Sequence, residues 1–236
     1  VPAREVPVLC EADVVVAGGG VGGVCAAVAA ARAGAQVTVI ERNAYAGGVA
    51  TAALMCSITN QLVTHSGEQV TFGLAVELLD RLVSEGGAMP WYGRSGQPQI
   101  PNDPEALKRV LAQMLAEAGV SSLYCSFVSQ PLLQGDSVEA VVCESQAGPF
   151  AARASQFVDA TGDLSLLAAA GGPCDMAPGN CTLLFRMAGV DFDAIIDWME
   201  AHPDSYSPDK DIPTSLQDTV RNWREFGVLH LPHYAG

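Results

Sequence analysis

The glycine-rich turn GGGVGG at residues 18–23 constrains the fold of this 236-residue chain more than any other feature. A β-branched run at residues 13–17 precedes it, and an Ala-rich stretch that stops at Gly34 follows it. The first pattern is typical of a strand buried in a parallel sheet, and the second of a helix ended by a glycine. With a further β-branched run at residues 36–41, the sequence predicts a right-handed βαβ unit.

The spacing of Gly18, Gly20 and Gly23 indicates a ligand for this turn. The first glycine permits a tight turn, the second lets a diphosphate approach the backbone, and the third lets the helix pack closely on the sheet. The free amides and positive dipole at the helix start favour the diphosphate. Glu41 ends the second strand 18 residues after Gly23, where a carboxylate accepts hydrogen bonds from a ribose diol and repels a 2′-phosphate. The motif predicts a dinucleotide and leaves NAD and FAD open.

Two further stretches help to decide between NAD and FAD. They are ERNAYAGG at residues 41–48 and DATGD at residues 159–163. Together with the glycine turn they resemble the FAD-dependent oxidoreductases of the glutathione-reductase-like superfamily, and most closely the bacterial family related to fumarate reductase flavoproteins. The resemblance extends over about residues 12–192. It implies a non-covalently bound FAD and hydride exchange between a small organic substrate and flavin N5. NAD becomes the weaker alternative.

The resemblance assigns the residues at the adenosine end of the cofactor. Gly18, Gly20 and Gly23 would hold the FAD diphosphate, as the spacing also indicates. Glu41 would hold the adenosine ribose, and Arg42 would flank the adenine. The resemblance therefore places the nucleotide at the carboxyl ends of the first two predicted strands.

The resemblance also implies a second set of contacts with FAD, made by Gly47, Gly48, Ala50, Thr51, Val128, Ala160, Thr161, Gly162 and Asp163. The paired glycines would lie along the diphosphate and the ribityl chain, and Val128 would meet the adenine through its backbone. Residues 160–162 would close over the cofactor, and Asp163 would lie near the diphosphate. From the residues alone, 159–163 is a strand end that turns into a helix, where ligands of open α/β sheets bind. A helix cap by Thr161 or Asp163 explains the same pattern, and both interpretations can hold.

The rest of the sequence predicts an α/β fold with a Rossmann-like FAD-binding domain. Helices are expected at residues 72–84, 104–118, 163–170, 191–202 and 213–226. Between residues 121 and 160 the pattern turns to β-strands joined by short turns, which predicts a β-meander inserted in the parallel sheet. We expect the N-terminal part of the FAD-binding domain at residues 1–175 and the start of a substrate or cap region at residues 176–236.

Three residues are candidates for the catalytic groups. Arg186 lies in an apolar stretch and would bind a substrate carboxylate or a flavin oxygen, although a buried ion pair explains it equally well. Cys56 and His65 are weaker candidates, for which a packed thiol and a surface histidine are the plainer interpretations. His230 and His233 are too few for a metal site, so no metal is expected.

The composition bears on partners. Hydrophobic residues make up 49% of the chain and charged residues 16%, and nothing after residue 192 resembles the C-terminal return to the FAD domain that is usual in this group. We therefore expect a second polypeptide that completes the fold, a missing C-terminal half or a homo-oligomer, with an apolar interface. A nucleotide-binding structural or regulatory subunit without catalysis of its own is the alternative.

The charge and the cysteines restrict the class of protein further. The net charge of −14 argues against a nucleic-acid partner, which needs a positive surface. No apolar run reaches the length of a membrane span. Seven cysteines without a CxxC pair, several of them in apolar runs, indicate reduced core thiols and a cytoplasmic protein.

Overall fold

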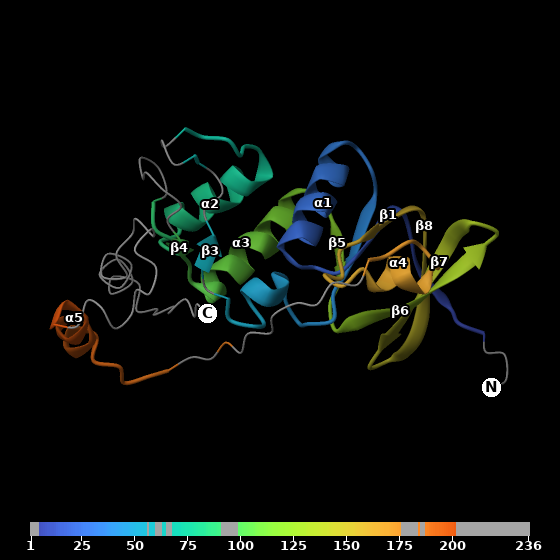
Figure 1. Ribbon diagram of the computed structural model, residues 1–236. Helices are drawn as coiled ribbons and strands as arrows, with labels where there is room; N and C mark the ends of the chain where they lie inside the picture. The colour runs from blue at the N-terminus through green and yellow to red at the C-terminus, as the bar shows by residue number, and fades with distance from the viewer. Residues whose placement is uncertain are drawn as a thin grey trace. The chain divides into compact units, whose positions relative to one another are not determined.

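The computed structural model describes residues 5–55, 57–59, 63–64, 68–90, 99–175, 184 and 187–201 (Figure 1). It divides into two compact units. Unit 1 comprises Val1–Ala53 and Lys108–Thr182, and unit 2 comprises Leu54–Leu107 and Leu183–Gly236. The first stretch of unit 1 contains the glycine turn, and its second stretch contains residues 159–163. The two segments therefore belong to the same unit.

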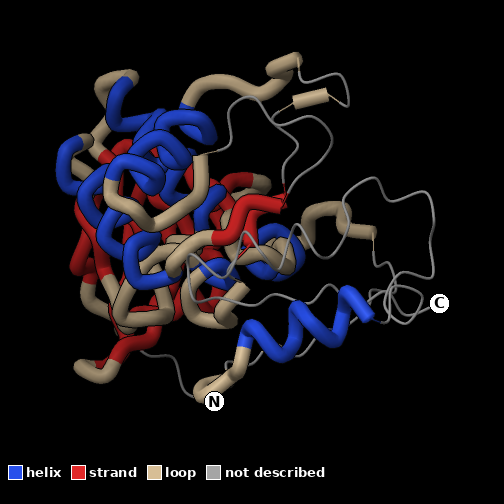
Figure 2. Tube along the Cα trace, turned by 90° about the vertical axis from the view of Figure 1, so that its left-hand side faces the viewer, coloured by secondary structure: helices blue, strands red, loops and turns tan. Residues whose placement is uncertain are grey.

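Unit 1 is built on a six-stranded sheet with the order β5-β2-β1-β8-β7-β6. Its strands, red in Figure 2, are β1 (Val8–Ala17), β2 (Val37–Ile40), β5 (Ser121–Leu123), β6 (Ser126–Gln134), β7 (Ser137–Ser145) and β8 (Gly148–Asp159). Strands β5, β2, β1 and β8 are parallel, and β8, β7 and β6 pair antiparallel. The predicted α/β fold with a parallel sheet and a β-meander is confirmed.

Strand β8 links the two halves of this sheet. Its first part, from Gly148 to Arg153, pairs with β7, and its stretch from Ala151 to Asp159 pairs with β1. The sequence predicts strands joined by short turns between residues 121 and 160, and the last of them is a single strand of 12 residues. A single strand that spans both halves attaches the meander firmly to the parallel strands.

Helix α1 (Val21–Arg32) begins directly after the glycine turn and packs on β1, β2 and β8. Its wholly buried residues Val24, Ala27 and Val28 follow the spacing of one helix face. It ends as predicted, since Gly34 has a φ of +98°, the left-handed conformation common after a helix. The short helix α4 (Ser165–Ala169) follows β8 and lies against β6 and β8 (Figure 1).

One apolar core lies against the central strands of unit 1. Its buried members are Val15, Ala17, Ile40, Val141, Cys143, Phe150, Ala152 and Leu166. They come from the parallel strands, the meander and α4, so these elements form one hydrophobic cluster. The last residues of β1 and β2 are therefore held in place by packing as well as by the sheet.

Unit 2 contains α2 (Leu74–Ser84), a two-stranded antiparallel sheet of β3 (Ser57–Thr59) and β4 (Gln99–Pro101), and α5 (Phe192–Ala201). The helix predicted at residues 213–226 lies outside the described residues. In the part of the chain that the structure describes, none of the helices is long and apolar enough to cross a membrane.

Helix α3 (Pro104–Glu117) runs from unit 2 into unit 1. It starts as predicted, because Oδ1 of Asp103 accepts a hydrogen bond of 2.9 Å from the backbone N–H of Glu105. Pro104 takes the first helical position, where its missing N–H costs nothing.

Candidate functional site

The sheet register brings three loops together at one edge. Ala17 at the end of β1 pairs with Ile40 of β2 on one side and with Asp159 of β8 on the other. The residues that follow these strands, Glu41, Gly18 and Ala160, therefore emerge at the same edge. The strand order also reverses here, since β2 and β8 lie on opposite sides of β1. Ligands of open α/β sheets bind at such a switch point.

Gly18 and Gly23 of the turn are required by the packing of the protein itself. Gly18 has a φ of +108°, and a Cβ there would overlap the carbonyl oxygen of Ala160. A Cβ on Gly23 would overlap the carbonyl oxygen of Gly18, so the glycine lets α1 approach the turn closely. Both roles match those predicted from the spacing.

Gly20 is different, because nothing in the described protein requires a glycine there. Its φ of −62° and ψ of 173° are open to any residue, and a Cβ would meet no atom within 4 Å. Gly20 caps α1, whose first turn carries no acidic residue and no side-chain cap bond. The open space therefore adjoins the amides at the positive end of a 12-residue helix, which suits a diphosphate group.

Glu41 lies beside this turn with both carboxylate oxygens in use. The residue is buried at 4% exposure. Oε2 accepts a hydrogen bond of 2.7 Å from the backbone N–H of Gly19. Oε1 accepts two more from Asn43, at 2.8 Å from the backbone N–H and 2.7 Å from Nδ2. The carboxylate of Glu41, the predicted ribose ligand, is thus fixed in place. Asn43 helps to fix it, and the sequence did not single out this residue.

The paired glycines fold back onto the turn. The N–H of Gly47 donates to the carbonyl of Gly19 at 2.8 Å, and Gly47 and Gly48 have φ values of +115° and +53°. The 3₁₀ turn η1 (Gly48–Ala50) follows, and the buried Thr51 donates its hydroxyl to the carbonyl of Ala46 at 3.0 Å. A Cβ on Gly47 would overlap the Thr51 side chain. Thr51 therefore shapes the loop, while Ala50 is partly exposed beside it.

Tyr45 connects this loop to α3. The ammonium group of Lys108 lies 3.8 Å from the centroid of the Tyr45 ring. Such a cation–π contact stabilises by about 0.5–1 kcal/mol at a partly exposed position. It helps to fix the segment between Glu41 and Gly47.

The segment after β8 is held by Asp159. Its Oδ1 accepts hydrogen bonds from the N–H and the hydroxyl of Thr161 at 3.0 and 2.7 Å, and its Oδ2 accepts one from the N–H of Leu167 at 2.8 Å. Burial opposes ionisation, but the hydrogen bonds from Leu167 and Thr161 outweigh it and lower the pKa of Asp159. Thr161 in turn accepts from the N–H of Ser165 at 2.9 Å. Thr161 therefore holds the first amide of α4, although the N-cap residue itself is Leu164.

The end of β2 also meets the start of β6. The N–H of Ser126 donates to the carbonyl of Glu41 at 3.0 Å, and the half-buried Val128 follows two residues later. Arg42 is exposed. All these groups belong to unit 1. The glycine turn, the buried carboxylate, the paired glycines and the 159–163 turn thus lie next to one another at this edge of the sheet.

A comparison with protein-family models matches residues 13–231 to the FAD dependent oxidoreductase family. The chain belongs to this family. The resemblance inferred from the sequence is thereby confirmed, and so is FAD as the cofactor. No curated protein sequence matches the chain.

Several solved structures resemble this member of the FAD dependent oxidoreductase family. THI4 from Thermovibrio ammonificans is 23% identical, with 67% of this chain and 61% of that chain covered and a TM-score of 0.49. L-proline dehydrogenase from P. horikoshii is 18% identical, with coverage of 70% and 56% and a TM-score of 0.49. The flavin-dependent brominase Bmp2 is 16% identical, with coverage of 68% and 40% and a TM-score of 0.50. The last likeness shows a shared fold, and the chain spans 40–61% of the lengths of these three proteins.

The structure does not describe the predicted catalytic residues of this family member. Arg186, Cys56 and His65 are outside the described residues, as are His230 and His233. Among the residues that the structure describes, no group of three or more His, Cys, Asp or Glu side chains is arranged to hold a metal ion.

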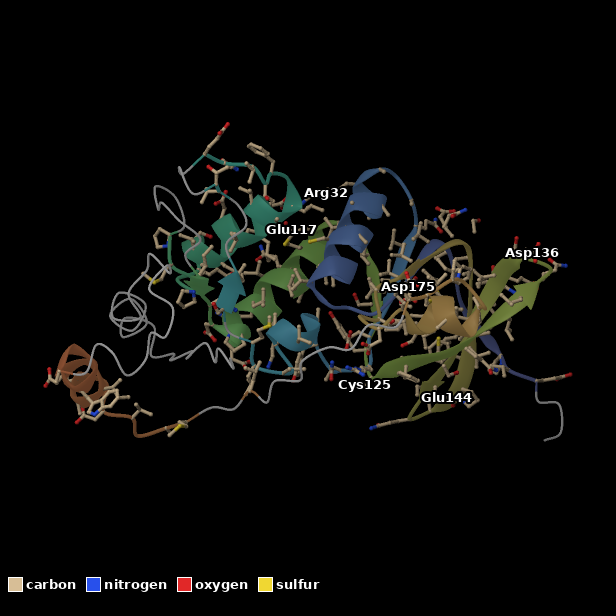
Figure 3. The ribbon with its side chains drawn as sticks, in the orientation of Figure 1. Arg32, Glu117, Cys125, Asp136, Glu144 and Asp175 are labelled. Atoms are coloured by element: carbon tan, nitrogen blue, oxygen red, sulfur yellow. The ribbon has the colours of Figure 1, made fainter. Side chains whose placement is uncertain are left out.

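One expectation about the cysteines is wrong. Cys143 is a buried core thiol, but Cys125 is exposed at the junction of β5 and β6 (Figure 3). Its φ of +53° places it in the left-handed conformation of a tight turn. The apolar neighbours in the sequence belong to two different strands that end and begin at this turn.

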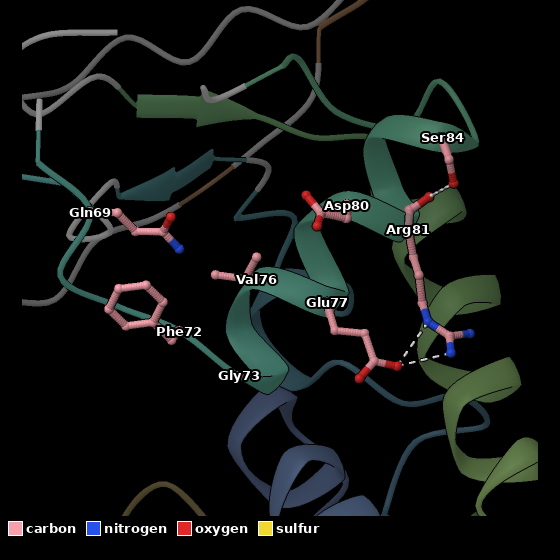
Figure 4. Close-up of a pocket in the computed structure, with 8 residues that line it drawn as sticks. All are labelled: Gln69, Phe72, Gly73, Val76, Glu77, Asp80, Arg81 and Ser84. Carbon is pink, nitrogen blue, oxygen red and sulfur yellow. Dashed lines mark hydrogen bonds and ion pairs between the residues drawn. The ribbon is translucent and has the colours of Figure 1, made fainter. Parts of the chain in front are cut away.

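Unit 2 contributes two features that the sequence did not reveal. An open pocket of about 520 Å³ lies along α2, next to the ion pair between Glu77 and Arg81 at 2.9 Å (Figure 4). None of the sequence-predicted site residues lines it. Within the described part of the chain, Asn102 alone has buried side-chain polar atoms, Oδ1 and Nδ2, without a hydrogen-bond partner.

Proposed function

We propose that this chain forms the FAD-binding part of an oxidoreductase that exchanges a hydride between a small organic substrate and flavin N5. The observation that carries the proposal is the open space at Gly20, next to the α1 amides and the buried carboxylate of Glu41. A glycine that the fold itself does not need is explained by a ligand that approaches the backbone. Membership in the FAD-dependent oxidoreductase family supports the same ligand.

The proposed contacts follow the geometry of unit 1. Gly18, Gly20 and Gly23 would hold the diphosphate at the start of α1, where the amides attract negative charge. Glu41 would accept the ribose and Arg42 would flank the adenine. The remaining proposed contacts are Gly47, Gly48, Ala50, Thr51, Val128, Ala160, Thr161, Gly162 and Asp163.

Thr51 would meet the cofactor through its backbone. Its hydroxyl already donates to the carbonyl of Ala46 at 3.0 Å, and the residue is buried at 1% exposure. A hydroxyl that is used inside the loop is not free to donate to a ligand. The side chain of Thr51 therefore holds the shape of the paired-glycine loop.

FAD, when bound, supplies the redox chemistry, and the protein supplies binding, orientation and electrostatics. The groups at the carboxyl edge of β1, β2 and β8 bind and orient the nucleotide half of the cofactor. Arg186, Cys56 and His65 remain the proposed groups at the reacting end, with Arg186 as an anchor for a substrate carboxylate or a flavin oxygen. Their roles rest on the sequence.

The first experiment tests whether the protein binds FAD. The purified protein is expected to be yellow, and heat denaturation should release one FAD for each chain, measured by chromatography and fluorescence. Protein purified without the cofactor should take up FAD in preference to NAD. A colourless protein that takes up neither FAD nor its adenosine part would overturn the proposal.

A second experiment separates an enzyme from a non-catalytic subunit. Under anaerobic conditions, candidate substrates are added to the FAD-loaded protein and the flavin absorbance near its visible maximum is followed. Bleaching by a substrate supports the oxidoreductase. Retention of FAD without bleaching by any substrate, even with a co-purifying partner present, would favour the structural or regulatory subunit.

We also propose that the chain works in the cytoplasm with a second polypeptide or a second copy of itself. Large apolar side chains on unit 1 support a partner, since Leu9 is 65% exposed, Phe127 52% and Leu133 49%. Exposed apolar groups of this kind are common at interfaces. Native mass spectrometry is expected to show a complex, and a stable lone monomer would contradict this part of the proposal.

A further inference from the structure

Asn43 makes an unusual pair of contacts beside the candidate ribose site. Its backbone N–H and its side-chain Nδ2 both donate to the same oxygen, Oε1 of Glu41, at 2.8 and 2.7 Å. The carboxylate of Glu41 is buried, so these hydrogen bonds lie in a medium where they are strong. Asn43 thereby fixes the plane of the carboxylate.

The remaining acceptor capacity of Glu41 can be counted. A carboxylate has about four lone-pair positions on its two oxygens. The two donors of Asn43 fill both lone-pair positions of Oε1, and the N–H of Gly19 fills one of the two positions of Oε2. One position on Oε2 is left for a ligand.

We infer that Asn43 is a positioning residue that holds Glu41 so that its carboxylate accepts a nucleotide ribose hydroxyl through Oε2. This inference rests on the proposed binding of FAD at this site. It adds that the ribose diol is recognised through one carboxylate oxygen, whose direction is set by an amide that does not itself need to touch the cofactor.

The backbone around Asn43 is anchored without its side chain. The N–H of Glu41 donates to the carbonyl of Leu123 at 2.9 Å, and the N–H of Cys125 donates to the carbonyl of Asn43 at 3.0 Å. Removal of the amide group should therefore leave the chain path in place. The loss of the Asn43 amide instead leaves the Glu41 carboxylate free to rotate, because the terminal torsion of a carboxylate has only broad preferences.

The test compares two ligands that differ only in the ribose hydroxyls. ADP and 2′,3′-dideoxy-ADP are used to displace FAD from the wild-type protein and from Asn43→Ala, with FAD fluorescence as the signal. We expect the substitution to weaken ADP about fivefold and to leave 2′,3′-dideoxy-ADP unchanged. In a Glu41→Ala background, Asn43→Ala should cause no further loss for ADP.

Two further variants keep the test decisive. Gln134→Ala removes an exposed amide at the end of β6 and should change neither ligand. Asn43→Leu keeps the approximate size of the side chain without its donor and adds no charge, and should weaken ADP at least as much as Asn43→Ala. It replaces the alanine variant if that protein folds poorly.

The outcomes separate this inference from the proposed function. Equal weakening of both ligands by Asn43→Ala would show a purely structural role and overturn the inference, as would unchanged ADP affinity. In either case FAD binding by the wild-type protein still stands. Failure of the wild-type protein to bind FAD or ADP would instead overturn the proposed function.

Discussion

The backbone N–H of Gly19 donates a hydrogen bond of 2.7 Å to Oε2 of Glu41. This bond joins the turn after β1 to the residue after β2. A Cβ on Gly19 would come within 2.9 Å of the Glu41 Cβ, so the carboxylate can approach only because position 19 is a glycine. Glu41 therefore stabilises the glycine turn and is also the group proposed to meet the ribose.

Glu41→Gln should weaken both the fold and the binding of FAD. Neutral hydrogen bonds are about half as strong as those to a carboxylate, so we expect FAD to dissociate with a constant about tenfold higher. Titration calorimetry and thermal unfolding measure the two effects. The matched control is Glu139→Gln. In the wild-type protein Glu139 forms an ion pair of 3.4 Å with Arg153, and both side chains are half-exposed, so this pair should contribute little to stability. Equal FAD affinity in the two variants would contradict the role of Glu41.

Gly20→Ala and Gly23→Ala should have opposite consequences. The methyl group at position 20 enters open space, so the variant should fold with nearly unchanged stability and lose at least about tenfold in FAD affinity. At position 23 the methyl group meets the carbonyl oxygen of Gly18, and the unfolding free energy should fall by about 1–3 kcal/mol. Urea unfolding and FAD titration of both variants check this. Unchanged FAD affinity in Gly20→Ala would remove the main support for the cofactor site.

The βαβ unit and its glycines were predictable from the sequence because those features are local. The β-branched run, the turn and the Ala-rich helix are adjacent in the chain, and Gly18 and Gly23 are each explained by their own conformation or a near contact. The roles of Asn43 and Asp159 could not be predicted, since the partner of a short polar side chain depends on the fold. Cys125 shows the same limit, because the sequence predicts a core thiol where two strands meet at an exposed turn.

The lowered pKa of Asp159 predicts a loss of stability in acid. A group whose pKa is lower in the folded than in the unfolded state stabilises the fold above its unfolded pKa, and this contribution is lost as the pH falls through the folded pKa. Unfolding free energies measured by urea from about pH 7 down to about pH 3 should therefore decline. In Asp159→Asn the decline should be smaller and the stability at neutral pH lower by about 1 kcal/mol. Asp136→Asn, at the exposed β6–β7 turn, is the control, and an identical pH dependence in all three proteins would contradict the prediction.

Asn102→Leu should stabilise unit 2. The buried amide of Asn102 has no hydrogen-bond partner among the described residues, and such a group costs about 1–3 kcal/mol that an apolar side chain of similar size does not. We expect the unfolding free energy to rise by about 1 kcal/mol and the melting temperature by about 2–4 °C. Differential scanning calorimetry measures both. A lower melting temperature would show that the amide is satisfied in the working protein.

Cys143 and Cys125 should differ sharply in reactivity. Burial raises the pKa of Cys143 to about 12, with smaller contributions from Cys10 and Glu144, so its thiol stays protonated at neutral pH. Because thiolates react and thiols do not, N-ethylmaleimide at about pH 7.5 should modify the exposed Cys125 in the native protein and leave Cys143 unmodified. Peptide mass spectrometry distinguishes the two sites, and denaturation in urea should make Cys143 reactive. Labelling of Cys143 in the native protein as fast as Cys125 would show that the core of unit 1 opens readily, contrary to the packing of β1, β7 and β8 around that thiol.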